Sequence, residues 1–380
     1  MFHFTDEQNL LMKSVSDLAK AELDPIAAEI DEKEGFNAAA FKSMARLGLL
    51  GITAGERYGG AGLGSLEATL AMEKLGEHCA STALSYLAHS ILCVNNIHEN
   101  GSETQKEKYL PKLINGEWLG GMGMTEPQAG SDTFGIKTKA VRQGSKYILD
   151  GTKMFITNGT VGDVFVIYAR TGEPRKNIST FIVEKSFPGF RVGKKLRKMG
   201  MRGSPTSELI FEHCEVPAEN LVGKENESSQ HLMRNLNIER ITISGISIGL
   251  ATASLEHAAQ YARERSQFGK LIGHFEMIQE KIAEMVVQRD AARALTYAAA
   301  TAYDRGLRDL SLGAEAKLYS AQIATRVALD AIQILGGYGY MKEYPVERYM
   351  RDAKLMEIGA GTNEIMRLIV AREYLKLREE

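Results

Sequence analysis

The chain has 380 residues, of which 44% are hydrophobic and 25% charged, and its formal net charge is -2 at pH 7. This length predicts two or three tightly packed domains with a large core, and the composition argues against extensive disorder. The near-neutral charge gives no field that would gather nucleic acid or an anionic membrane, so we expect no nucleic-acid partner.

The cysteines, histidines and N-terminal residues exclude further classes. Cys79, Cys93 and Cys214 are odd in number and lack CxxC spacing, which favours buried thiols in a reduced compartment over disulfides or a zinc site. The eight histidines form no HExxH pair, so no metal site is predicted. No basic leader with an apolar run is present, and no span reaches the ~20 apolar residues of a membrane helix. We expect a cytoplasmic protein, or a mitochondrial matrix protein whose leader has been removed, without membrane insertion.

Residues 1–119 are predicted to form an N-terminal α-helical domain. Helix-capping signals occur at Thr5-x-x-Gln8 and at Ser102-x-x-Gln105. Apolar residues recur between them with helical spacing, and glycines separate the helical segments.

Residues 120–226 are predicted to form a compact antiparallel sheet or barrel. Short runs rich in β-branched and aromatic residues alternate there with turn pairs, of which Asp150-Gly151 and Asn158-Gly159 are two. The expected strands are Tyr147–Leu149, Met154–Thr157, Val164–Ala169, Thr180–Val183 and Leu209–Phe211.

Residues 227–380 are predicted to form a C-terminal helical domain. The helical period returns in three long segments, at residues 231–265, 275–305 and 313–335. Several of these segments are apolar on more than one face, which is typical of helices buried in a bundle or between subunits.

Two glycine clusters could suggest a phosphate-binding loop, but their context argues against it. Gly336 to Gly339 follows a helix instead of a strand and lacks GxGxxG spacing. Gly189 to Lys195 is one residue too short for a P-loop and carries Lys where Ser or Thr should hold magnesium. The run from Gly59 to Gly64 is interpreted as a flexible surface loop. A dinucleotide would therefore need another kind of site.

Four separated segments carry the functional signal. They are Met124–Asp132, Lys153–Gly159, Arg263–Gly269, and a C-terminal group made of Gln333–Gly337, Arg351–Lys354 and Gly361–Glu364. In their joint order and spacing they resemble the acyl-CoA dehydrogenase family of flavoproteins over essentially the whole chain. The subfamily that the chain most resembles is isovaleryl-CoA dehydrogenase, through Ser85-Tyr86, Ala88–Ser90, Gln105–Leu113, Lys198–Ser204 and Glu357–Thr362.

The resemblance implies an α+β multidomain fold with an N-terminal helical domain, a middle antiparallel β-barrel and a C-terminal four-helix bundle. It also implies a homotetramer with one FAD per subunit. By analogy Thr125, Phe155 and Thr157 contact the isoalloxazine, and the Thr157 hydroxyl lies near flavin N5, where it can donate or accept as the redox state changes. Without the other motifs, Thr157 would be an ordinary exposed strand threonine.

The resemblance also assigns residues to the rest of the cofactor and to the substrate. Those that would bind the adenosine diphosphate half of a neighbouring subunit's FAD are Arg265, Phe268, Gln333 and Gly337, with Thr362 and Glu364 on the other side. The guanidinium of Arg265 can pair with pyrophosphate oxygens at two points, although the helix dipole alone favours a cation at that helix end. Ser131 is a candidate for contact with cofactor and CoA, and Arg240 and Gly361 are candidates for contact with substrate.

Dehydrogenation at unactivated carbons needs a base that removes the α proton while the β hydrogen leaves as hydride. Most of the family carries a glutamate directly before the final Gly-Thr, where this chain has Ala360. In isovaleryl-CoA and long-chain members a Glu-Arg pair early in the first long C-terminal helix supplies the base, and Glu239-Arg240 occupies that place here. Glu239 shares a helical face with apolar and small residues, so partial desolvation would raise its pKa toward neutrality.

Two alternatives to this assignment stay open at the level of the local sequence. An adjacent Glu-Arg pair on a helix can be a solvated surface pair, and Glu357 is a competing carboxylate that we interpret as structural. By analogy the thioester oxygen accepts hydrogen bonds from the backbone N–H of Ala360 and from a ribityl hydroxyl of FAD. A backbone donor does not depend on the side chain, so alanine at position 360 is compatible with this role.

The expected activity is FAD-dependent dehydrogenation of an acyl-CoA thioester to the trans-2-enoyl-CoA. The expected substrate carries a short branched chain such as isovaleryl, and electrons would pass to electron-transfer flavoprotein. Leu87 stands where isovaleryl enzymes tend to carry a smaller residue, which can reshape the acyl pocket. The alternatives are an acyl-CoA oxidase or desulfinase-like relative, and a catalytically silent paralogue that binds FAD or acyl-CoA.

Overall fold

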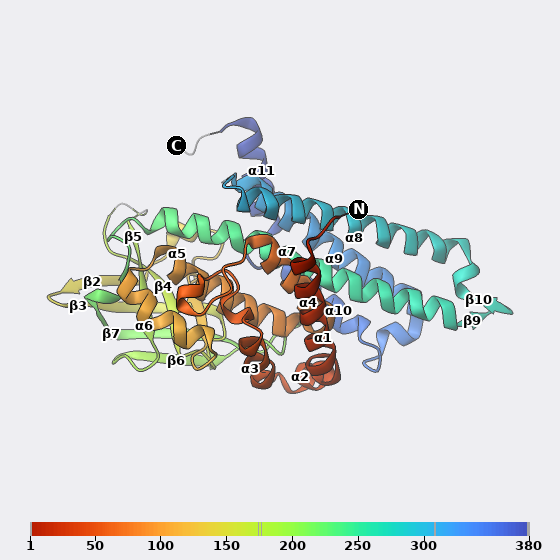
Figure 1. Ribbon diagram of the computed structural model, residues 1–380, viewed down its shortest axis with the longest axis horizontal. Helices are drawn as coiled ribbons and strands as arrows, with labels where there is room; N and C mark the ends of the chain where they lie inside the picture. Colours follow the sequence, from red (N-terminus) through yellow and green to blue (C-terminus); the bar gives the residue numbers. More distant parts are fainter. Residues whose placement is uncertain (1, 174, 176, 308, 378–380) are drawn as a thin grey trace.

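The computed structural model describes residues 2–173, 175, 177–307 and 309–377. Its elements follow one another as a helical block, a β block and a second helical block. The β block lies at one end of the long axis of the molecule, and the tip of the hairpin between the longest helices lies at the other end (Figure 1).

The first block is helical, as predicted. Its helices are α1 (Asp6–Glu22), α2 (Ala27–Lys33), α3 (Ala38–Arg46), α4 (Ser65–Leu87), α5 (Asn96–Asn100) and α6 (Glu103–Ile114), and a buried π-helix (Ala88–Asn95) continues α4. The Thr5 hydroxyl accepts from the Gln8 amide at 3.1 Å and the Ser102 hydroxyl from the Gln105 amide at 3.3 Å. In both cases the glutamine side-chain oxygen accepts a hydrogen bond from the backbone N–H of the capping residue, so both predicted capping boxes are confirmed.

The predicted surface loop at Gly59–Gly64 is present, with Gly59, Gly62 and Leu63 exposed, but its backbone is held by hydrogen bonds instead of being free. Backbone hydrogen bonds run from the Ala61 amide to the Gly51 carbonyl at 3.0 Å and from the Leu63 amide to the Ile52 carbonyl at 2.9 Å. A Cβ on Gly60 would lie 2.1 Å from the carbonyl oxygen of Ala54. The glycine is needed there because two stretches of backbone touch.

The second block is a mostly antiparallel eight-stranded sheet. Its strands are β1 (Gly120–Gly123), β2 (Lys139–Gln143), β3 (Lys146–Thr157), β4 (Val164–Arg170), β5 (Ile178–Glu184), β6 (Phe190–Lys195), β7 (Thr206–Pro217) and β8 (Leu221–Val222). They run in the order β6-β7-β3-β2-β4-β5-β8, and β1 joins β4 in parallel. The segment excluded as a P-loop is strand β6. The sequence did not predict β1, β2, β6, β8 or the parallel pairings.

One of the two predicted turns is wrong. Asp150 and Gly151 lie inside the continuous strand β3, where the pairing with β7 shifts register between Leu149 and Gly151. The Asp150 carboxylate accepts from the amide of His213, on β7, at 2.7 Å, so the pair belongs to an irregularity in the ladder instead of a turn. The predicted turn at Asn158-Gly159 is confirmed, because β3 ends at Thr157 and Asn158 adopts φ +65°.

The third block contains the three long helices that the sequence predicted. Its elements are α7 (Ser228–Glu264), the short strands β9 (Ser266–Gln267) and β10 (Lys270–Leu271), α8 (Glu276–Asp304), α9 (Leu310–Leu335), α10 (Val346–Met356) and α11 (Asn363–Leu375). The 37 residues of α7 extend over about 55 Å at ~1.5 Å per residue. A 3₁₀ turn, Gly336–Tyr340, follows α9, so this glycine cluster does not follow a strand.

Glycines let α4 and α7 approach until their backbones touch. A Cβ on Gly249 of α7 would lie 2.5 Å from the carbonyl oxygen of Glu73, and one on Gly245 would lie 2.5 Å from that of Thr69. The surrounding side chains belong to the largest hydrophobic cluster, which joins the two helical blocks. The long helix that carries Glu239 is therefore fixed against the N-terminal block.

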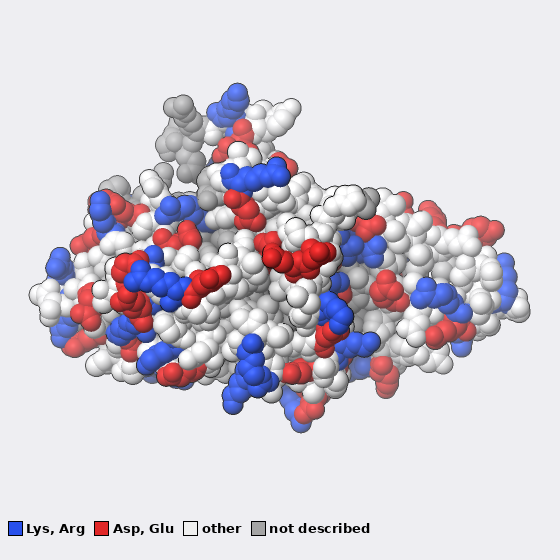
Figure 2. Space-filling model, viewed as in Figure 1, with Lys and Arg blue, Asp and Glu red and all other residues white. Residues whose placement is uncertain are grey.

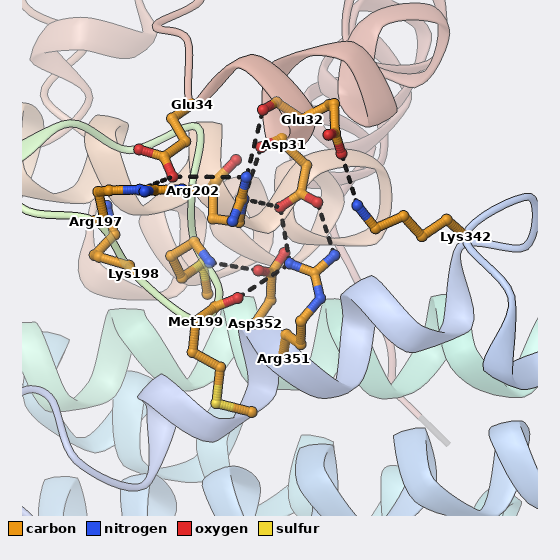
Figure 3. Close-up of polar contacts among 12 residues, drawn as sticks. Asp31, Glu32, Glu34, Arg197, Lys198, Met199, Arg202, Lys342, Arg351 and Asp352 are labelled. Carbon is orange, nitrogen blue, oxygen red and sulfur yellow. Dashed lines mark hydrogen bonds and ion pairs between the residues drawn. The ribbon is translucent and has the colours of Figure 1, made fainter.

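Charged residues tie the segment before β7 to both helical blocks (Figure 3). The Arg351 guanidinium of α10 donates to both carboxylate oxygens of Asp31 on α2, at 3.0 and 2.7 Å. Arg202 donates to the Asp31 carbonyl at 2.8 Å, and the Met201 amide donates to the buried carboxylate of Asp352. This cluster joins parts of the chain that are up to 320 residues apart in sequence.

The surface carries no single-sign field on the face shown in Figure 2, where basic and acidic side chains are interspersed. Within the described ranges, none of the helices combines the length and apolar character needed to cross a lipid bilayer.

Replacing Gly249 by Ala should lower the free energy of unfolding by about 1–3 kcal/mol, because the added methyl overpacks a backbone contact. Denaturant unfolding of the holoenzyme measures this change. Gln260→Ala on an exposed position of the same helix is the matched control and should change stability by less than about 0.5 kcal/mol. Equal or higher stability of Gly249→Ala would mean that helix propensity outweighs the contact, since Ala is intrinsically the better helix former by ~1 kcal/mol.

Candidate active site

A buried carboxylate, that of Glu239, lies on α7. Glu239 is only 6% exposed, and its Oε2 atom has no hydrogen-bond partner among the described residues. Burial raises the pKa of Glu239 to about 7, against the opposing positive charges of Arg240 and Lys317. The sequence predicted this desolvation from the helical face, and the alternative of a solvated surface pair is wrong.

Arg240 is buried beside it. The side chain is 4% exposed, and its Nε and Nη1 atoms have no partner within the described part of the chain. Burial lowers the pKa of Arg240, while the carboxylate of Glu239 acts in the opposite direction. Two adjacent buried charged groups with unused hydrogen-bonding atoms are typical of a site that holds a polar ligand.

A tight turn between α10 and α11 lies near this pair. Ala360 and Gly361 both adopt left-handed backbone conformations, with φ of +54° and +90°. Lys317 of α9 donates from Nζ to the Gly361 carbonyl at 2.6 Å, and its own charge interacts with Glu239. Lys317 thus connects the predicted base to the turn that carries the predicted oxyanion donor.

The residues predicted to contact the isoalloxazine meet at the β block. The Met154 amide of β3 donates to the Thr125 carbonyl at 2.8 Å, which brings Thr125 beside the segment that carries Phe155 and Thr157. Phe155 is 65% exposed and has φ +61°, at a register shift between β3 and β7. A bulky residue held in this conformation is costly and is often found at functional sites.

A buried ion pair that the sequence did not predict supports Thr125. Lys153 of β3 is fully buried and donates to Glu126 at 2.8 Å and to the Met124 carbonyl at 3.0 Å. Burial opposes ionisation of Glu126, but Lys153 and backbone donors outweigh it and lower the pKa of Glu126 to about 2. Both residues lie inside segments of the functional signal, which is the only sequence feature that could have identified them.

A second group of predicted residues lies at the far end of the α7–α9 pair. Arg265, Phe268, Gln333 and Gly337 are all exposed, Phe268 to 94%. A groove of about 470 Å³ at this end is lined by Arg265, Gly337, Tyr338 and neighbouring residues. The Arg265 guanidinium lies 5.6 Å from the Tyr338 ring centroid and pairs with no carboxylate of the described chain. A free guanidinium beside an exposed glycine backbone suits an anionic ligand.

The predicted base and the second group of residues lie far apart along α7 within one chain. Arg265 follows Glu239 by 26 residues along the straight axis of α7, which corresponds to about 39 Å at ~1.5 Å per residue. Figure 1 shows β9 and β10, which follow Arg265, at the opposite end of the molecule from the large sheet.

The remaining predicted residues have simpler surroundings. Thr362 caps α11, since its hydroxyl accepts from the Ile365 amide at 3.3 Å. Glu364 is exposed in the first turn of that helix, where a backbone N–H lowers its pKa. Ser131 lies on the exposed loop before β2, and no hydrogen bond of the described residues joins it to Arg240. Glu357 pairs with Lys354 at 2.9 Å.

The predicted burial of the cysteines is confirmed. The three cysteines are buried free thiols. Over the part of the chain that the structure describes, no three His, Cys, Asp or Glu side chains gather in a way that could hold a metal ion.

Comparison with known families covers nearly the whole chain. Residues 5–117 match the family Acyl-CoA dehydrogenase, N-terminal domain, residues 121–214 match Acyl-CoA dehydrogenase, middle domain, and residues 230–375 match Acyl-CoA dehydrogenase, C-terminal domain. Isovaleryl-CoA dehydrogenase, mitochondrial, of Pongo abelii is 47% identical over 376 residues, which cover 97% of this chain and 89% of that protein. Acyl-CoA dehydrogenase of Bacillus subtilis (strain 168) is 44% identical over 375 residues, with coverages of 98% and 99%.

Solved structures share the fold over their full length. Butyryl-CoA dehydrogenase from Megasphaera elsdenii has a TM-score of 0.96 at 39% identity and covers 99% of this chain and 100% of its own. A chain from a study of the electron transferring flavoprotein of Acidaminococcus fermentans and flavin-based electron bifurcation has a TM-score of 0.97 at 41% identity, with both chains covered in full. The protein therefore belongs to the acyl-CoA dehydrogenase family of flavoproteins, which are oxidoreductases that act on CH–CH donors.

Proposed function

We propose that the protein catalyses FAD-dependent α,β-dehydrogenation of an acyl-CoA thioester to the trans-2-enoyl-CoA, with Glu239 as the base. One observation carries this proposal: the Glu239 carboxylate is buried, lacks a partner at Oε2 and has a pKa near 7. A base with this pKa is ionised in a useful fraction at neutral pH and still strong enough to accept a proton. Ala360, at the position most of the family uses for the base, has no side chain that could take its place.

The residues present fit a bound FAD. Phe155 has an exposed aromatic side chain on β3, and the backbone bond from Met154 to Thr125 brings Thr125 to this strand, which also carries Thr157. The two threonines supply hydroxyl groups that can donate or accept hydrogen bonds. The unpaired guanidinium of Arg265 and the exposed backbone at Gly337 supply donors for a pyrophosphate. When bound, FAD would accept the two electrons that leave the substrate with the β hydrogen.

The chain's own residues would handle the proton and the thioester. Glu239 removes the proton from the α carbon, and the carboxylic acid so formed is stable in its buried position because burial favours the neutral form. The Ala360 N–H donates to the thioester oxygen, where negative charge develops as the α proton leaves. Ser131 and Arg240 are the proposed contacts for the CoA part of the substrate, and Gly361 is a further proposed substrate contact. The unused donors Nε and Nη1 of Arg240 support this role.

Replacing Glu239 by Gln should slow anaerobic bleaching of the flavin by acyl-CoA at least about 100-fold, because the amide cannot accept the α proton. Stopped-flow absorbance of the holoenzyme measures the rate. Glu357→Gln is the matched control, since it removes the competing carboxylate, which pairs with Lys354. It should bleach at close to the normal rate. Unimpaired bleaching by Glu239→Gln, or loss of bleaching only in Glu357→Gln, would show that the base is assigned to the wrong residue.

We propose further that the adenosine diphosphate half of each FAD is bound by a neighbouring subunit in a homotetramer. The separation of about 39 Å along α7 supports this arrangement, because Arg265 cannot reach a flavin bound beside Glu239 in its own chain. Thr362 and Glu364 are the proposed contacts on the other side of the cofactor. Large exposed apolar side chains on the third block also support an assembly, among them Phe268, Met277, Tyr340 and Tyr374.

Replacing Arg265 by Gln should weaken FAD binding about tenfold or more, because two charge-assisted hydrogen bonds to a pyrophosphate are lost. Release of FAD fluorescence on dilution measures the affinity. Arg263→Gln is the matched control, since Arg263 is exposed on the same helix end and should leave FAD affinity unchanged. Wild-type FAD retention by Arg265→Gln would contradict the shared site.

The substrate that we propose is a short branched acyl-CoA such as isovaleryl-CoA, and the proposed electron acceptor is an electron-transfer flavoprotein. The identity of 47% to an isovaleryl-CoA dehydrogenase supports the first proposal. The likeness to a chain studied with an electron transferring flavoprotein supports the second. Leu87 is fully buried at the end of α4, where its size could alter which acyl chains fit.

A panel of straight and branched acyl-CoA thioesters should give the highest kcat/KM for isovaleryl-CoA. One methylene more or less in an apolar pocket changes the preference by only ~1 to 3 kcal/mol, so neighbouring chains should react about 10- to 200-fold less well. Reduction of an electron-transfer flavoprotein gives the rate. A maximum for a straight chain would overturn the branched-chain proposal without affecting the dehydrogenase activity.

A further inference from the structure

Lys317 is a buried lysine on α9, and its side-chain hydrogen bonds go to the Gly361 carbonyl and to Asn363, at the turn before α11. The side chain is 1% exposed, and Nζ donates to the Gly361 carbonyl at 2.6 Å and to Asn363 Oδ1 at 3.4 Å. Asn363 is also buried and begins α11. An ammonium group is costly to bury without acceptors, so the carbonyl and the amide oxygen hold it in place and it holds them in return.

The turn that Lys317 holds is strained. Ala360 is a non-glycine residue with φ +54°, and Gly361 follows with φ +90°. The left-handed conformation is unfavourable for alanine and persists only where the surroundings enforce it. One peptide unit separates the Ala360 N–H from the Gly361 carbonyl, and both groups belong to the same tight turn. A donor that fixes this carbonyl therefore restricts the conformations open to the turn, and with them the direction of the Ala360 N–H.

We infer that Lys317 is a positioning residue, which fixes the turn carrying the Ala360 N–H and places a positive charge facing the Glu239 carboxylate. This inference rests on the proposed function and extends it. The base on α7 and the amide on the turn would act on the same α carbon and thioester, and Lys317 on α9 is the group that contacts the turn and interacts with the base.

The charges around these groups agree with this role. Burial lowers the pKa of Lys317 to about 8, and Glu239 opposes that change. The other charged groups facing Lys317 are Arg240 on α7, Glu357 after α10 and Glu364 on α11. Those facing Glu239 are Arg240 and Lys317, and its charge also raises the pKa of the buried Tyr168 on β4. The lysine charge lowers the pKa of Glu239, so removing it should raise that pKa.

The test uses the holoenzyme and two readouts of proton removal. The first is the pH dependence of kcat/KM. The second is the long-wavelength absorption of an acyl-CoA analogue with sulfur in place of the β methylene, which can lose its α proton but cannot give up a hydride. The band reports the enolate stacked on the oxidised flavin, so it follows the base and the oxyanion donor without turnover.

Both readouts are measured as a function of pH, and each should fall at low pH as Glu239 becomes protonated; this fall is called the acid limb. Replacing Lys317 by Met should move the acid limb to higher pH by about one unit, because Glu239 then protonates more readily. The shift is to higher pH because the base is active only when ionised, and a higher pKa requires a higher pH for ionisation. At pH values above the limb, kcat should remain about tenfold lower with KM little changed, because the amide is no longer held in position. Lys317→Gln, which keeps a polar group in the buried site, should shift the limb in the same direction and serves if the Met variant does not fold.

Two further variants separate this role from a structural one. Lys317→Arg keeps the charge and should return the limb toward its normal pH. Lys281→Met removes a lysine whose ion pair with Asp330 joins α8 to α9 at 2.7 Å, and it should leave the limb unmoved. The inference would be overturned if the Met and Gln variants had a lower melting temperature but an unchanged acid limb. Loss of proton removal in Glu239→Gln beside an unchanged limb in Lys317→Met would refute only the role of Lys317, whereas unimpaired Glu239→Gln would refute the proposed base.

Discussion

The burial of the Glu239 carboxylate is the physical constraint on which the rest of the candidate site depends. A carboxylate removed from water prefers its neutral form, which brings its pKa to about 7 and makes it a candidate base at neutral pH. Arg240 and Lys317 keep the ionised form accessible by their charge, yet Oε2 stays without a partner in the described chain. A buried polar atom without a partner is costly for folding, and a catalytic role is one of the reasons for which such an atom is retained.

The rest of the fold can be understood as the support that this carboxylate needs. Helix α7 is pressed against α4 through Gly245 and Gly249, where neither helix has room for a larger residue. The partly buried ion pair between Arg351 and Asp31 joins α10 to α2. Hydrogen bonds from Arg202 to Asp31 and from Met201 to Asp352 tie the segment before β7 to the same two helices (Figure 3). The sheet in turn presents Phe155 in a left-handed conformation at a shift in register. Each contact joins segments that are distant in sequence.

The features that the sequence could predict are those that depend on interactions between residues close together in the chain. Long helices, capping boxes and the face of Glu239 depend on residues within a few positions, so their periodicity is visible in the chain. The Asp150-Gly151 pair shows where local patterns fail to predict the structure. Its residues are typical of a turn, but pairing with β7, more than 60 residues later in the chain, keeps them in a strand. Lys317 is a second residue whose role local sequence patterns could not predict. A single lysine in a helix suggests a solvated side chain, and only the fold brings it to Gly361, 44 residues away.

The central claim is that the proton acceptor sits on α7 instead of beside the final Gly-Thr. The most direct measurement is the distance from each carboxylate to the α carbon in a crystal structure of the holoenzyme with an acyl-CoA that cannot be oxidised. The account predicts a Glu239 oxygen within about 3.5 Å of the α carbon and the thioester oxygen on the Ala360 N–H. An α carbon that faces Glu357 or another carboxylate, with Glu239 out of reach, would contradict it.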